Sequence, residues 1–274
     1  MRIRDFVKRR FGVILPDDAL ARLGLRLLPP PDRETEILLS DGQRLAIPPR
    51  YPPFRGLATR VFERDVVAYL SSVLKAGMTF VDLGANIGYY TLLASRLVGP
   101  CGIVYAFEPD ALMFDYLTRN IATNRCRNVI ATDVAVTDRN GTAAFVSSES
   151  VRGWIAVVPT GVRTSLVRTV TLDAFLAARG WPPVHLIKLD VEGSEKFVLE
   201  GMREVCARNP GLQLIMEYNL STMHRAGVTP EVLGKTLGAL GFATGYVIEQ
   251  GLLPFSTAVT SPQPAICNVL FVER

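Results

Sequence analysis

Residues 80–90 read FVDLGANIGYY, which has the form of a strand, a tight turn and the start of a helix. The apolar run ends at Asp82, and two glycines four positions apart, Gly84 and Gly88, follow it. This is how a nucleotide-binding turn begins in an open α/β sheet. Dinucleotide-binding turns, however, have the pattern G-x-G-x-x-G and hold a pyrophosphate on backbone N–H groups. Here Asn86 replaces the middle glycine, and the carboxylate of Asp82 would repel a phosphate.

From residue 61 onward, near-continuous apolar strands alternate with amphipathic helices. The expected strands are TFVDL (79–83), GIVYAF (102–107), NVIATDVAV (128–136), VHLIKLD (184–190), LQLIMEY (212–218), FATGYVI (242–248) and AICNVLFV (265–272). The expected helices cover residues 61–74, 87–98, 111–124, 194–207 and 230–240, and residues 138–170 read as a polar, irregular region. This alternation predicts an α/β fold with a mainly parallel sheet covered on both faces. Ligands bind such sheets beyond the carboxyl ends of the strands, so the residues that close each strand are the candidates for function.

Residues 1–60 differ from the rest of the chain and predict a separate N-terminal extension. Proline-rich patches at 28–33 and 47–54 bracket two short strands around Asp41-Gly42, a dipeptide suited to a tight hairpin turn. The basic stretch before them predicts a short helix. We therefore expect an extension at residues 1–60, a candidate substrate or dimer element, and a main domain at residues 61–274.

The overall composition excludes several classes of protein. No segment approaches the roughly 18 uninterrupted apolar residues that a membrane span needs, and the N-terminus lacks a secretory cleavage site. A net charge of +4 is too small and too dispersed to indicate nucleic-acid binding. The four cysteines lack the close spacing of a zinc site or a disulfide framework. We expect a cytoplasmic protein with no transmembrane segment and no nucleic-acid partner.

The negative charge of Asp82 suits a ligand that brings positive charge and no phosphate. S-adenosylmethionine is such a ligand, because it carries a sulfonium and an α-ammonium beside its adenosine, and its carboxylate could use N–H groups of the turn. Glu108 closes the second strand, where a carboxylate can bind both ribose hydroxyls, although NAD enzymes use an acid similarly. Asp133, near the end of the third strand, could accept from the adenine amino group. Each acid alone could be a solvated or helix-capping residue, but together they predict S-adenosylmethionine as the cofactor.

Five segments together resemble one known family of enzymes. They are FVDLGANIGYYT (80–91), FEPD (107–110), DVAVTDRNGT (133–142), TLDAF (171–175) and LIKLDVEGSEKFVLEGM (186–202). Over roughly residues 63–219 the chain is similar to the FkbM family of S-adenosylmethionine-dependent methyltransferases, and IKLDVEGSE is the most discriminating segment.

The resemblance implies a class I, Rossmann-like three-layer sandwich whose seven-stranded sheet is mostly parallel with an antiparallel last strand. It also implies O-methylation of a hydroxyl on a sugar or secondary metabolite, in natural-product or glycan biosynthesis. The cofactor residues that it implies are Asp82, Gly84, Ala85, Asn86, Gly88, Glu108, Pro109, Asp133, Val134 and Asp190. Residues 1–60 and 220–274 match no motif of the family, so the acceptor stays open.

Asp190 and Lys188 are the first candidates for the chemistry. Methyl transfer is an in-line displacement, in which the acceptor oxygen lies about 3 Å from the methyl carbon, and an alcohol also loses its proton to a base. Asp190 closes its strand next to the expected methyl position, and the strand period of two puts Lys188 on the same side. Asp190 is therefore a candidate for the base, for the residue that holds the acceptor hydroxyl or for the partner of the cofactor's ammonium. The alternative is a purely structural Lys188–Asp190 pair.

More polar residues follow the next strand. Glu217 and Asn219 share a face, and His224, whose imidazole suits proton abstraction near neutral pH, comes shortly after them. Glu192 is expected to cap the helix that begins near residue 194, because acids favour helix N-termini. Asp190, Glu217 and Asn219 could also hold a divalent ion that orients a diol, but their spacing does not require a metal and we expect none. The candidates for catalysis are Asp190, Lys188, Glu217 and His224.

Other functions remain open at this point. An NAD-dependent oxidoreductase is disfavoured by Asp82 and by the missing middle glycine, and a test of cofactor binding would decide. Nucleic-acid amino-methyltransferases commonly carry an Asn/Asp-Pro-Pro-aromatic motif after the fourth strand, where this chain has LDVEGSE. The acid set disfavours a non-catalytic binding module. A protein or lipid-linked glycan acceptor and a homodimer stay open.

Overall fold

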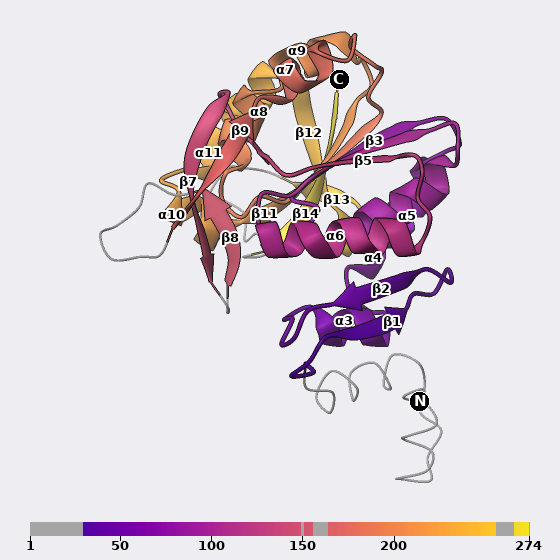
Figure 1. Ribbon diagram of the computed structural model, residues 1–274. Helices are drawn as coiled ribbons and strands as arrows, with labels where there is room; N and C mark the ends of the chain where they lie inside the picture. The colour runs from indigo at the N-terminus through magenta and orange to yellow at the C-terminus, as the bar shows by residue number, and fades with distance from the viewer. Residues whose placement is uncertain (1–29, 149–150, 156–163, 256–265, 274) are drawn as a thin grey trace. The chain divides into compact units, whose positions relative to one another are not determined.

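The structure is a computed structural model that describes residues 30–148, 151–155, 164–255 and 266–273 (Figure 1). The chain divides into two compact units, Met1–Ala68 and Tyr69–Arg274. The sequence places the boundary near residue 60, whereas the division in the structure falls inside helix α4 (Arg64–Val73). The last residues of α4 therefore begin the larger unit.

The first unit contains a two-stranded antiparallel sheet and a short helix. Its elements are β1 (Thr35–Leu38), β2 (Arg44–Ile47) and α3 (Phe54–Thr59). At the turn between the strands, the Asp41 carboxylate accepts a hydrogen bond from the Gln43 N–H at 3.1 Å, and Gly42 has a φ of +89°. Aspartate and glycine are favoured in such turns for these two reasons. The helix expected at the N-terminus lies outside the described residues.

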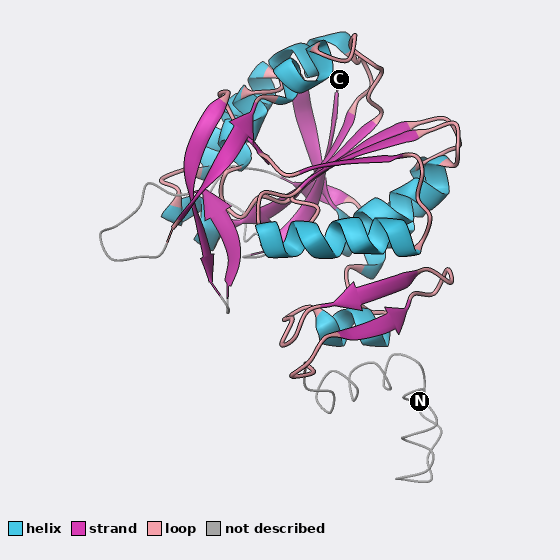
Figure 2. Cartoon of the chain, in the orientation of Figure 1, coloured by secondary structure: helices cyan, strands magenta, loops and turns pink. Residues whose placement is uncertain are grey.

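The second unit is built on a mixed eight-stranded sheet with the strand order β13-β12-β14-β11-β10-β3-β4-β5 (Figure 2). Its strands are β3 (Thr79–Leu83), β4 (Ile103–Phe107), β5 (Val129–Thr132), β10 (Leu186–Leu189), β11 (Gln213–Asn219), β12 (Phe242–Val247), β13 (Leu253–Phe255) and β14 (Ile266–Glu273). Strands β5, β4, β3, β10 and β11 are parallel, and β14 runs antiparallel between β11 and β12. The mostly parallel sheet is confirmed. The predicted count of seven strands is wrong, because β13 adds a short edge strand beside β12.

Helices cover both faces of this sheet. They are α5 (Tyr89–Val98), α6 (Ala111–Thr123), α7 (Leu172–Ala177), α8 (Glu195–Glu200), α9 (Arg203–Arg208), α10 (Leu220–Arg225), α11 (Pro230–Ala239) and the 3-10 helix η1 (Ile248–Gln250). Helices α5 and α6 lie on one side of the sheet and α7, α8 and α9 on the other (Figure 1). The second unit therefore has the three layers that the sequence predicts.

One predicted helix, residues 194–207, is divided into α8 and α9. The break falls at Gly201, where a Cβ would lie 2.1 Å from the Thr137 carbonyl oxygen. The Asp173 carboxylate then caps α9 by accepting hydrogen bonds from the N–H groups of Glu204 (3.1 Å) and Val205 (2.9 Å). A close backbone approach and an acid from another helix, both distant in sequence, thus end one helix and start the next.

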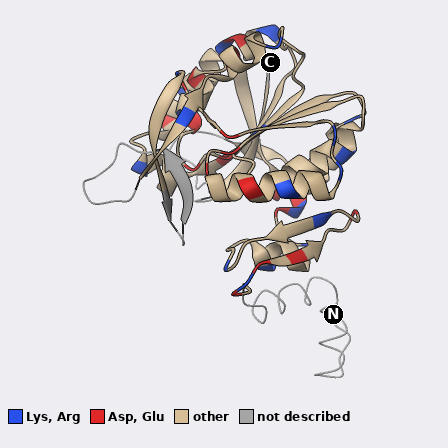
Figure 3. Cartoon of the chain, viewed as in Figure 1, with Lys and Arg blue, Asp and Glu red and all other residues tan. Residues whose placement is uncertain are grey.

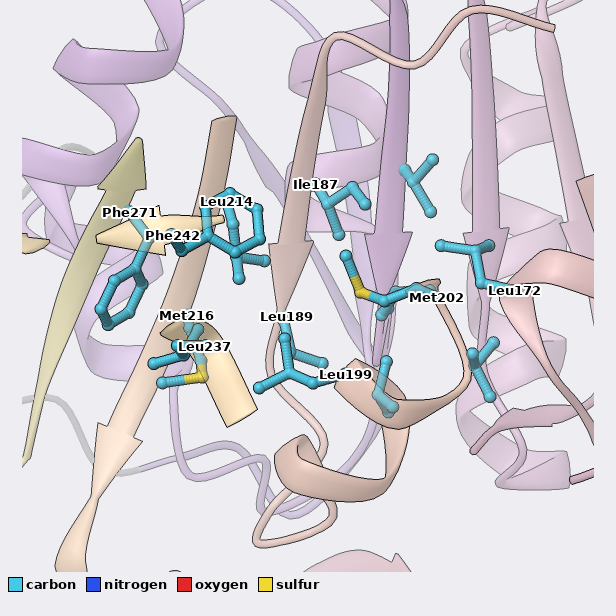
Figure 4. Packing of buried hydrophobic residues seen from close by; sticks show 14 of the residues in the cluster. Leu172, Ile187, Leu189, Leu199, Met202, Leu214, Met216, Leu237, Phe242 and Phe271 are labelled. Carbon is cyan, nitrogen blue, oxygen red and sulfur yellow. The ribbon is translucent and has the colours of Figure 1, made fainter. Parts of the chain in front are cut away.

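The main core lies between the central strands and the helices of one face. Figure 4 shows its side chains on β10, β11, α8 and α11, among them Ile187, Leu189, Leu199, Leu214, Met216 and Leu237. Side chains of a strand alternate between the two faces of its sheet. Lys188, between Ile187 and Leu189, therefore points to the opposite face, where its Nζ lies 5.3 Å from the ring centroid of Tyr90 on α5. The core fixes β10 so that this lysine reaches the site.

Residues 135–170 contain a second sheet. The prediction of an irregular region at residues 138–170 is therefore wrong. Its strands are β6 (Ala135–Val136), β7 (Gly141–Ser148), β8 (Val151–Ile155) and β9 (Ser165–Val170), in the order β6-β9-β7-β8. The predicted strand 128–136 is accordingly divided between β5 of the main sheet and β6. Ala135, Phe145 and Val167 form a small buried cluster of their own in this region, apart from the main core, so the apolar signal in the sequence is weak.

Candidate active site

Asp82 is buried at the end of the central strand β3. Its side chain is 2% exposed and accepts a hydrogen bond from Thr91 Oγ1 of α5 at 2.6 Å. Its register partner on the neighbouring strand β10 is Lys188. Burial raises the pKa of Asp82 to about 6, while the Thr91 hydrogen bond and the Lys188 ammonium act in the opposite direction. A cationic ligand beside this poorly solvated carboxylate would favour its charged form.

The turn between β3 and α5 uses its backbone N–H groups within the protein. The N–H groups of Gly84 and Ala85 both donate to the Phe107 carbonyl, at 3.0 and 2.9 Å, and the N–H of Gly88 donates to the Ala85 carbonyl at 2.9 Å. The two N–H groups between them donate to side chains: that of Asn86 to Glu108 Oε2 at 2.8 Å, and that of Ile87 to Asn86 Oδ1 at 2.9 Å. A pyrophosphate would find each of these donors already engaged. The same holds for the methionine carboxylate, which the sequence analysis placed on them. The turn therefore differs from a phosphate cradle in its hydrogen bonds as well as in its charge.

Gly84 is the point at which the turn meets the end of β10. It has a φ of +84°, and a Cβ there would lie 1.9 Å from the Asp190 carbonyl oxygen. The Asp190 N–H donates to the Leu83 carbonyl at 3.0 Å. Only glycine tolerates both the left-handed backbone and this close approach. The two loops are thus packed backbone against backbone, and Asp190 is fixed relative to the turn.

Glu108, at the end of β4, is the second buried acid. Its side chain is 6% exposed, and its two oxygens accept hydrogen bonds from the N–H groups of Asn86 and Asp110, both at 2.8 Å. Burial raises the pKa of Glu108 to about 7, although both backbone hydrogen bonds lower it. Pro109, next to it, is half-buried and leads into α6, whose N-cap is Asp110. Glu108 therefore braces the turn, and each of its oxygens has a second lone pair for a ligand hydroxyl.

Asp133, the third acid of the predicted cofactor set, has a different environment. Its side chain is 58% exposed and forms an ion pair with Arg168 of β9. Val134 beside it is buried. The structure thus brings Asp82 and Glu108 to the same turn. Asp133 instead lies at an exposed rim of the site, where its partner Arg168 comes from the second sheet.

Lys188 on β10 and Asp190, which follows the strand, form an ion pair. Lys188 is 1% exposed, and its Nζ lies 3.4 Å from Asp190 Oδ2. The contact between Lys188 and Asp190 that the structural alternative requires is therefore present. Asp190 nevertheless keeps 15% of its side chain exposed at the end of the strand. The positive charge of the Lys188 ammonium partly offsets the negative charges of both Asp190 and Asp82.

Three carboxylates meet near the carboxyl ends of β10 and β11. Asp190, Glu192 and Glu217 each offer an oxygen, and these oxygens lie within 4.8 Å of one another. A group of this kind can hold a divalent cation or accept hydrogen bonds from several hydroxyls. The sequence analysis placed Asn219 in this group instead of Glu192. Glu192 was predicted to cap α8, but it lies in the preceding turn with a φ of +55°, and Ser194 is the N-cap.

Asn219 and His224 take other positions. The side-chain oxygen of Asn219 caps α10 by accepting from the N–H groups of Ser221 (3.1 Å) and Thr222 (3.3 Å), and its Nδ2 donates to Glu217 Oε1 at 3.3 Å. It therefore orients one of the three carboxylates. His224 lies on an exposed face of α10. Within the described part of the chain, no hydrogen bond or ion pair joins His224 to the acids.

Three further residues belong to the site and escape the sequence analysis: Thr91, Tyr90 and Glu195. Thr91 is a buried polar residue on the inner face of α5, nine positions after Asp82, and helical periodicity could have placed it there. Glu195 begins α8 but is 4% exposed, and burial raises its pKa to about 7, with the Asp190 charge adding to the effect. The sequence around Glu195 resembles an ordinary acidic first turn and carries no sign of this burial.

The strand order, the antiparallel β14 and the acids at the carboxyl ends of the strands together define a class I, Rossmann-like methyltransferase. Residues 82–236 match the sequence profile of the Methyltransferase FkbM domain, which is more than half of the chain. The chain belongs to the FkbM methyltransferase family. The resemblance found in the sequence is thereby confirmed, and membership of this family implies S-adenosylmethionine as the methyl donor.

Individual relatives act on chemically different acceptors, by their names. The hexuronic acid methyltransferase AglP of Haloferax volcanii is 28% identical over 183 residues, which are 66% of this chain and 70% of that protein. The 31-O-demethyl-FK506 methyltransferase FkbM of Streptomyces tacrolimicus is 30% identical over 165 residues, 48% of this chain and 62% of that protein. Among solved structures, a methyltransferase FkbM from Methylobacillus flagellatus aligns with a TM-score of 0.48 at 16% identity, covering 76% of this chain and 47% of that one.

Among the described residues, no helix combines the length and the apolar character that crossing a membrane requires.

Proposed function

We propose that this protein transfers a methyl group from S-adenosylmethionine to a hydroxyl of a sugar or secondary metabolite. The observation that carries the proposal is the pair of buried acids, Asp82 and Glu108, at one turn whose N–H groups are already engaged. This arrangement favours an adenosine compound with positive charge and disfavours one with a pyrophosphate. It also counts against the NAD-dependent alternative.

Most of the predicted cofactor residues have a role in this proposal. Glu108 accepts hydrogen bonds from the ribose hydroxyls beside Pro109, and Asp82 faces the cationic methionine portion. Asp133 and Val134 border the adenine, with the Asp133 carboxylate accepting from the amino group. The glycines let the backbone pass close to the ligand. The bound cofactor supplies an electrophilic methyl carbon on its sulfonium.

The acceptor end favours a hydroxyl over an anionic group. Asp190, Glu192 and Glu217 place three carboxylate oxygens within 4.8 Å of one another. Carboxylates accept hydrogen bonds from hydroxyl groups and repel carboxylates and phosphates. The name of one relative, for a 31-O-demethyl compound, supports a hydroxyl of a secondary metabolite. The name of another, for a hexuronic acid, supports a sugar, although that sugar carries a carboxylate that this cluster would repel. Of the chemical groups on such molecules, a neutral hydroxyl fits this cluster best.

Asp190 is the proton acceptor in the proposed reaction. It lies at the end of β10 against Gly84, next to the cofactor turn, and Lys188 at 3.4 Å favours its ionised form before the reaction. Asp190 would take the proton of the acceptor hydroxyl as its oxygen bonds to the methyl carbon, the carbon–sulfur bond breaks and S-adenosylhomocysteine leaves. Glu217, held by Asn219 at 3.3 Å, orients the hydroxyl. His224 lies apart from these groups, so the proton is assigned to Asp190.

The remaining acceptors fit less well. In the view of Figure 3, basic residues are interspersed with acidic ones over the described elements, which differs from the basic stripe of many nucleic-acid enzymes. The acidic cluster would also repel a phosphate backbone. A protein or lipid-linked glycan would reach the site through a hydroxyl and would obey the same preference.

A labelled-methyl assay tests the proposal. The protein is incubated with radiolabelled S-adenosylmethionine and two matched acceptor panels, neutral glycosides and glycosylated metabolites in one, the corresponding hexuronic acids and sugar phosphates in the other. We expect label in a base-stable ether of a neutral acceptor. Label that appears only in base-labile esters of the hexuronic acids would refute the assignment of a hydroxyl acceptor.

A further inference from the structure

Glu195 is a buried carboxylate that the proposed reaction does not use. It begins α8, its side chain is 4% exposed, and its Oε1 accepts a hydrogen bond from the Gly193 N–H at 3.0 Å. Its Oε2 is buried and has no hydrogen-bond partner among the described residues. An ordinary acid in the first turn of a helix stays in solvent, where it interacts with the helix dipole. The side chain of Glu195 instead turns back into the loop that follows Asp190.

This loop, residues 190–193, has little freedom to move at two of its positions. At one end, the Asp190 carbonyl lies so close to Gly84 that a Cβ there would approach it to 1.9 Å. At the other end, Gly193 has a φ of +106°, and a Cβ on it would lie 2.7 Å from the Thr222 carbonyl. Glu192 between them has a φ of +55°. Left-handed backbone of this kind persists only where the surroundings hold it.

The Gly193 N–H is the buried donor in this loop, and Glu195 supplies its acceptor. A buried N–H without an acceptor is unfavourable, so loss of the acceptor would favour rotation of the Gly193 peptide. Rotation there would move Glu192 and, through it, the end of β10. This hydrogen bond therefore bears on the positions of two of the three clustered carboxylates, Asp190 and Glu192.

We propose that Glu195 is a positioning residue for methyl transfer, which holds the 190–193 turn, and with it Asp190 and Glu192, in the geometry that the acceptor requires. The inference rests on the proposed function, because it concerns the turn that carries the proton acceptor. In this role Glu195 acts through the Gly193 peptide, to which it is hydrogen-bonded. A displacement of about 1 Å at a reacting group can cost roughly a hundredfold in rate.

Three variants of the full chain separate this role from others. Glu195→Ala removes the acceptor, whereas Glu195→Gln keeps a side-chain oxygen at the position of Oε1 and removes only the charge. Glu204→Ala is the matched control, because Glu204 is also an acid in the first turn of a six-residue helix but is 59% exposed. Turnover, affinity for S-adenosylmethionine and amide hydrogen exchange of peptides covering residues 190–194 are measured for each.

We expect Glu195→Ala to lower kcat roughly 10- to 100-fold, to change the Kd for S-adenosylmethionine less than about threefold and to raise exchange in 190–194 about tenfold. In Glu195→Gln, kcat, the Kd for S-adenosylmethionine and the exchange in 190–194 should each stay within about threefold of the parent values. Glu204→Ala should match the parent in all three. A glutamine variant as impaired as the alanine variant would overturn the proposal, and so would an alanine variant with parental exchange. If Glu195→Ala does not fold, the glutamine variant still decides. A parent that transfers no methyl group to any acceptor contradicts the proposed function instead, and the exchange data then still test the role of Glu195.

Discussion

The proposed cofactor end and the proposed acceptor end of the site both depend on carboxylates, but the protein holds these carboxylates differently at the two ends. At the cofactor end Asp82 and Glu108 are 2% and 6% exposed, and the hydrogen bonds of Thr91 and two backbone N–H groups fix them. At the acceptor end Asp190, Glu192 and Glu217 are partly exposed and cluster around the end of β10. A site that binds one invariant ligand can be built in advance, whereas a site for an acceptor must stay open to it.

The difference also separates two kinds of electrostatics. Burial without a full counter-charge raises the pKa values of Asp82 and Glu108 to about 6 and 7. A cationic ligand bound at this end would stabilise the ionised carboxylates. At the acceptor end Lys188 already lies 3.4 Å from Asp190. Cofactor binding beside Asp82 and Glu108 should therefore depend on pH near neutrality. Methyl transfer at the acceptor end should depend on the carboxylate of Asp190.

The largest expected effect is that of Asp190→Asn on turnover. Asparagine keeps the shape of the side chain but cannot take a proton, so kcat should fall by about 10²- to 10⁴-fold. The Kd for S-adenosylmethionine should change less than about fivefold, because the cofactor acids are untouched. Asp115→Asn, on the exposed face of α6, is the control. Equal losses in kcat and in cofactor affinity would place Asp190 at the cofactor end instead.

A second prediction uses two glycines with nearly the same backbone. Gly84 and Gly77 have φ values of +84° and +85°, but only Gly84 has a neighbour in the way of a Cβ, the Asp190 carbonyl at 1.9 Å. Gly77→Ala should cost about 1–2 kcal/mol of unfolding free energy, the cost of the left-handed conformation alone. Gly84→Ala should cost more, about 3 kcal/mol or above, and should also abolish cofactor binding. Denaturant titration of both variants measures the difference, and equal losses would mean that the two loops are not packed together.

The pH dependence should have opposite signs for binding and for stability. The raised pKa values mean that the folded protein binds more protons than the unfolded chain between about pH 4 and 7, so the stability contributed by Asp82 and Glu108 is lost as pH rises through their folded pKa values. A cationic ligand needs the ionised acids, so its affinity should fall about tenfold between pH 7 and pH 5. Calorimetry and thermal denaturation across this range test both signs, and Asp82→Asn should flatten the binding curve. An affinity that rises as the pH falls would contradict the role of Asp82.

The smallest effect is expected at the rim. Arg168 engages Asp133 in a pair whose side chains are 66% and 58% exposed, and exposed pairs contribute about 0–1 kcal/mol. Arg168→Ala should free Asp133 for the adenine amino group and tighten the Kd for S-adenosylmethionine by up to about threefold. Asp133→Ala should weaken it by a similar factor. A large loss of affinity in Arg168→Ala would mean that the arginine itself binds the cofactor.

The sequence predicts the cofactor end better than the acceptor end, for a physical reason. The acids Asp82 and Glu108 follow strands with strong apolar signals, and a single turn connects them through Asn86. At the acceptor end, the close approaches on either side of Glu192 join Asp190 to Gly84 and Gly193 to Thr222, which are far away in the sequence. Local patterns therefore identify Asp190 but misread Glu192 as a helix cap.

The fold shows the same limit. The alternation of strands and helices predicts the parallel core, because each element has a clear apolar face. The second sheet is missed because its buried residues are few, and Leu166 on β9 is 79% exposed although it is apolar. The break at Gly201 is missed because the Thr137 carbonyl that causes it lies in another part of the chain.

The most direct test of the central claim is a calorimetric titration of the parent protein with S-adenosylmethionine, S-adenosylhomocysteine and NAD at pH 7.5 and one salt concentration. The buried acids should bind both adenosyl compounds, with a preference for the positively charged sulfonium donor, and NAD should give no measurable heat. Saturable NAD binding that is tighter than S-adenosylmethionine binding would contradict the assignment of this turn to a cationic cofactor.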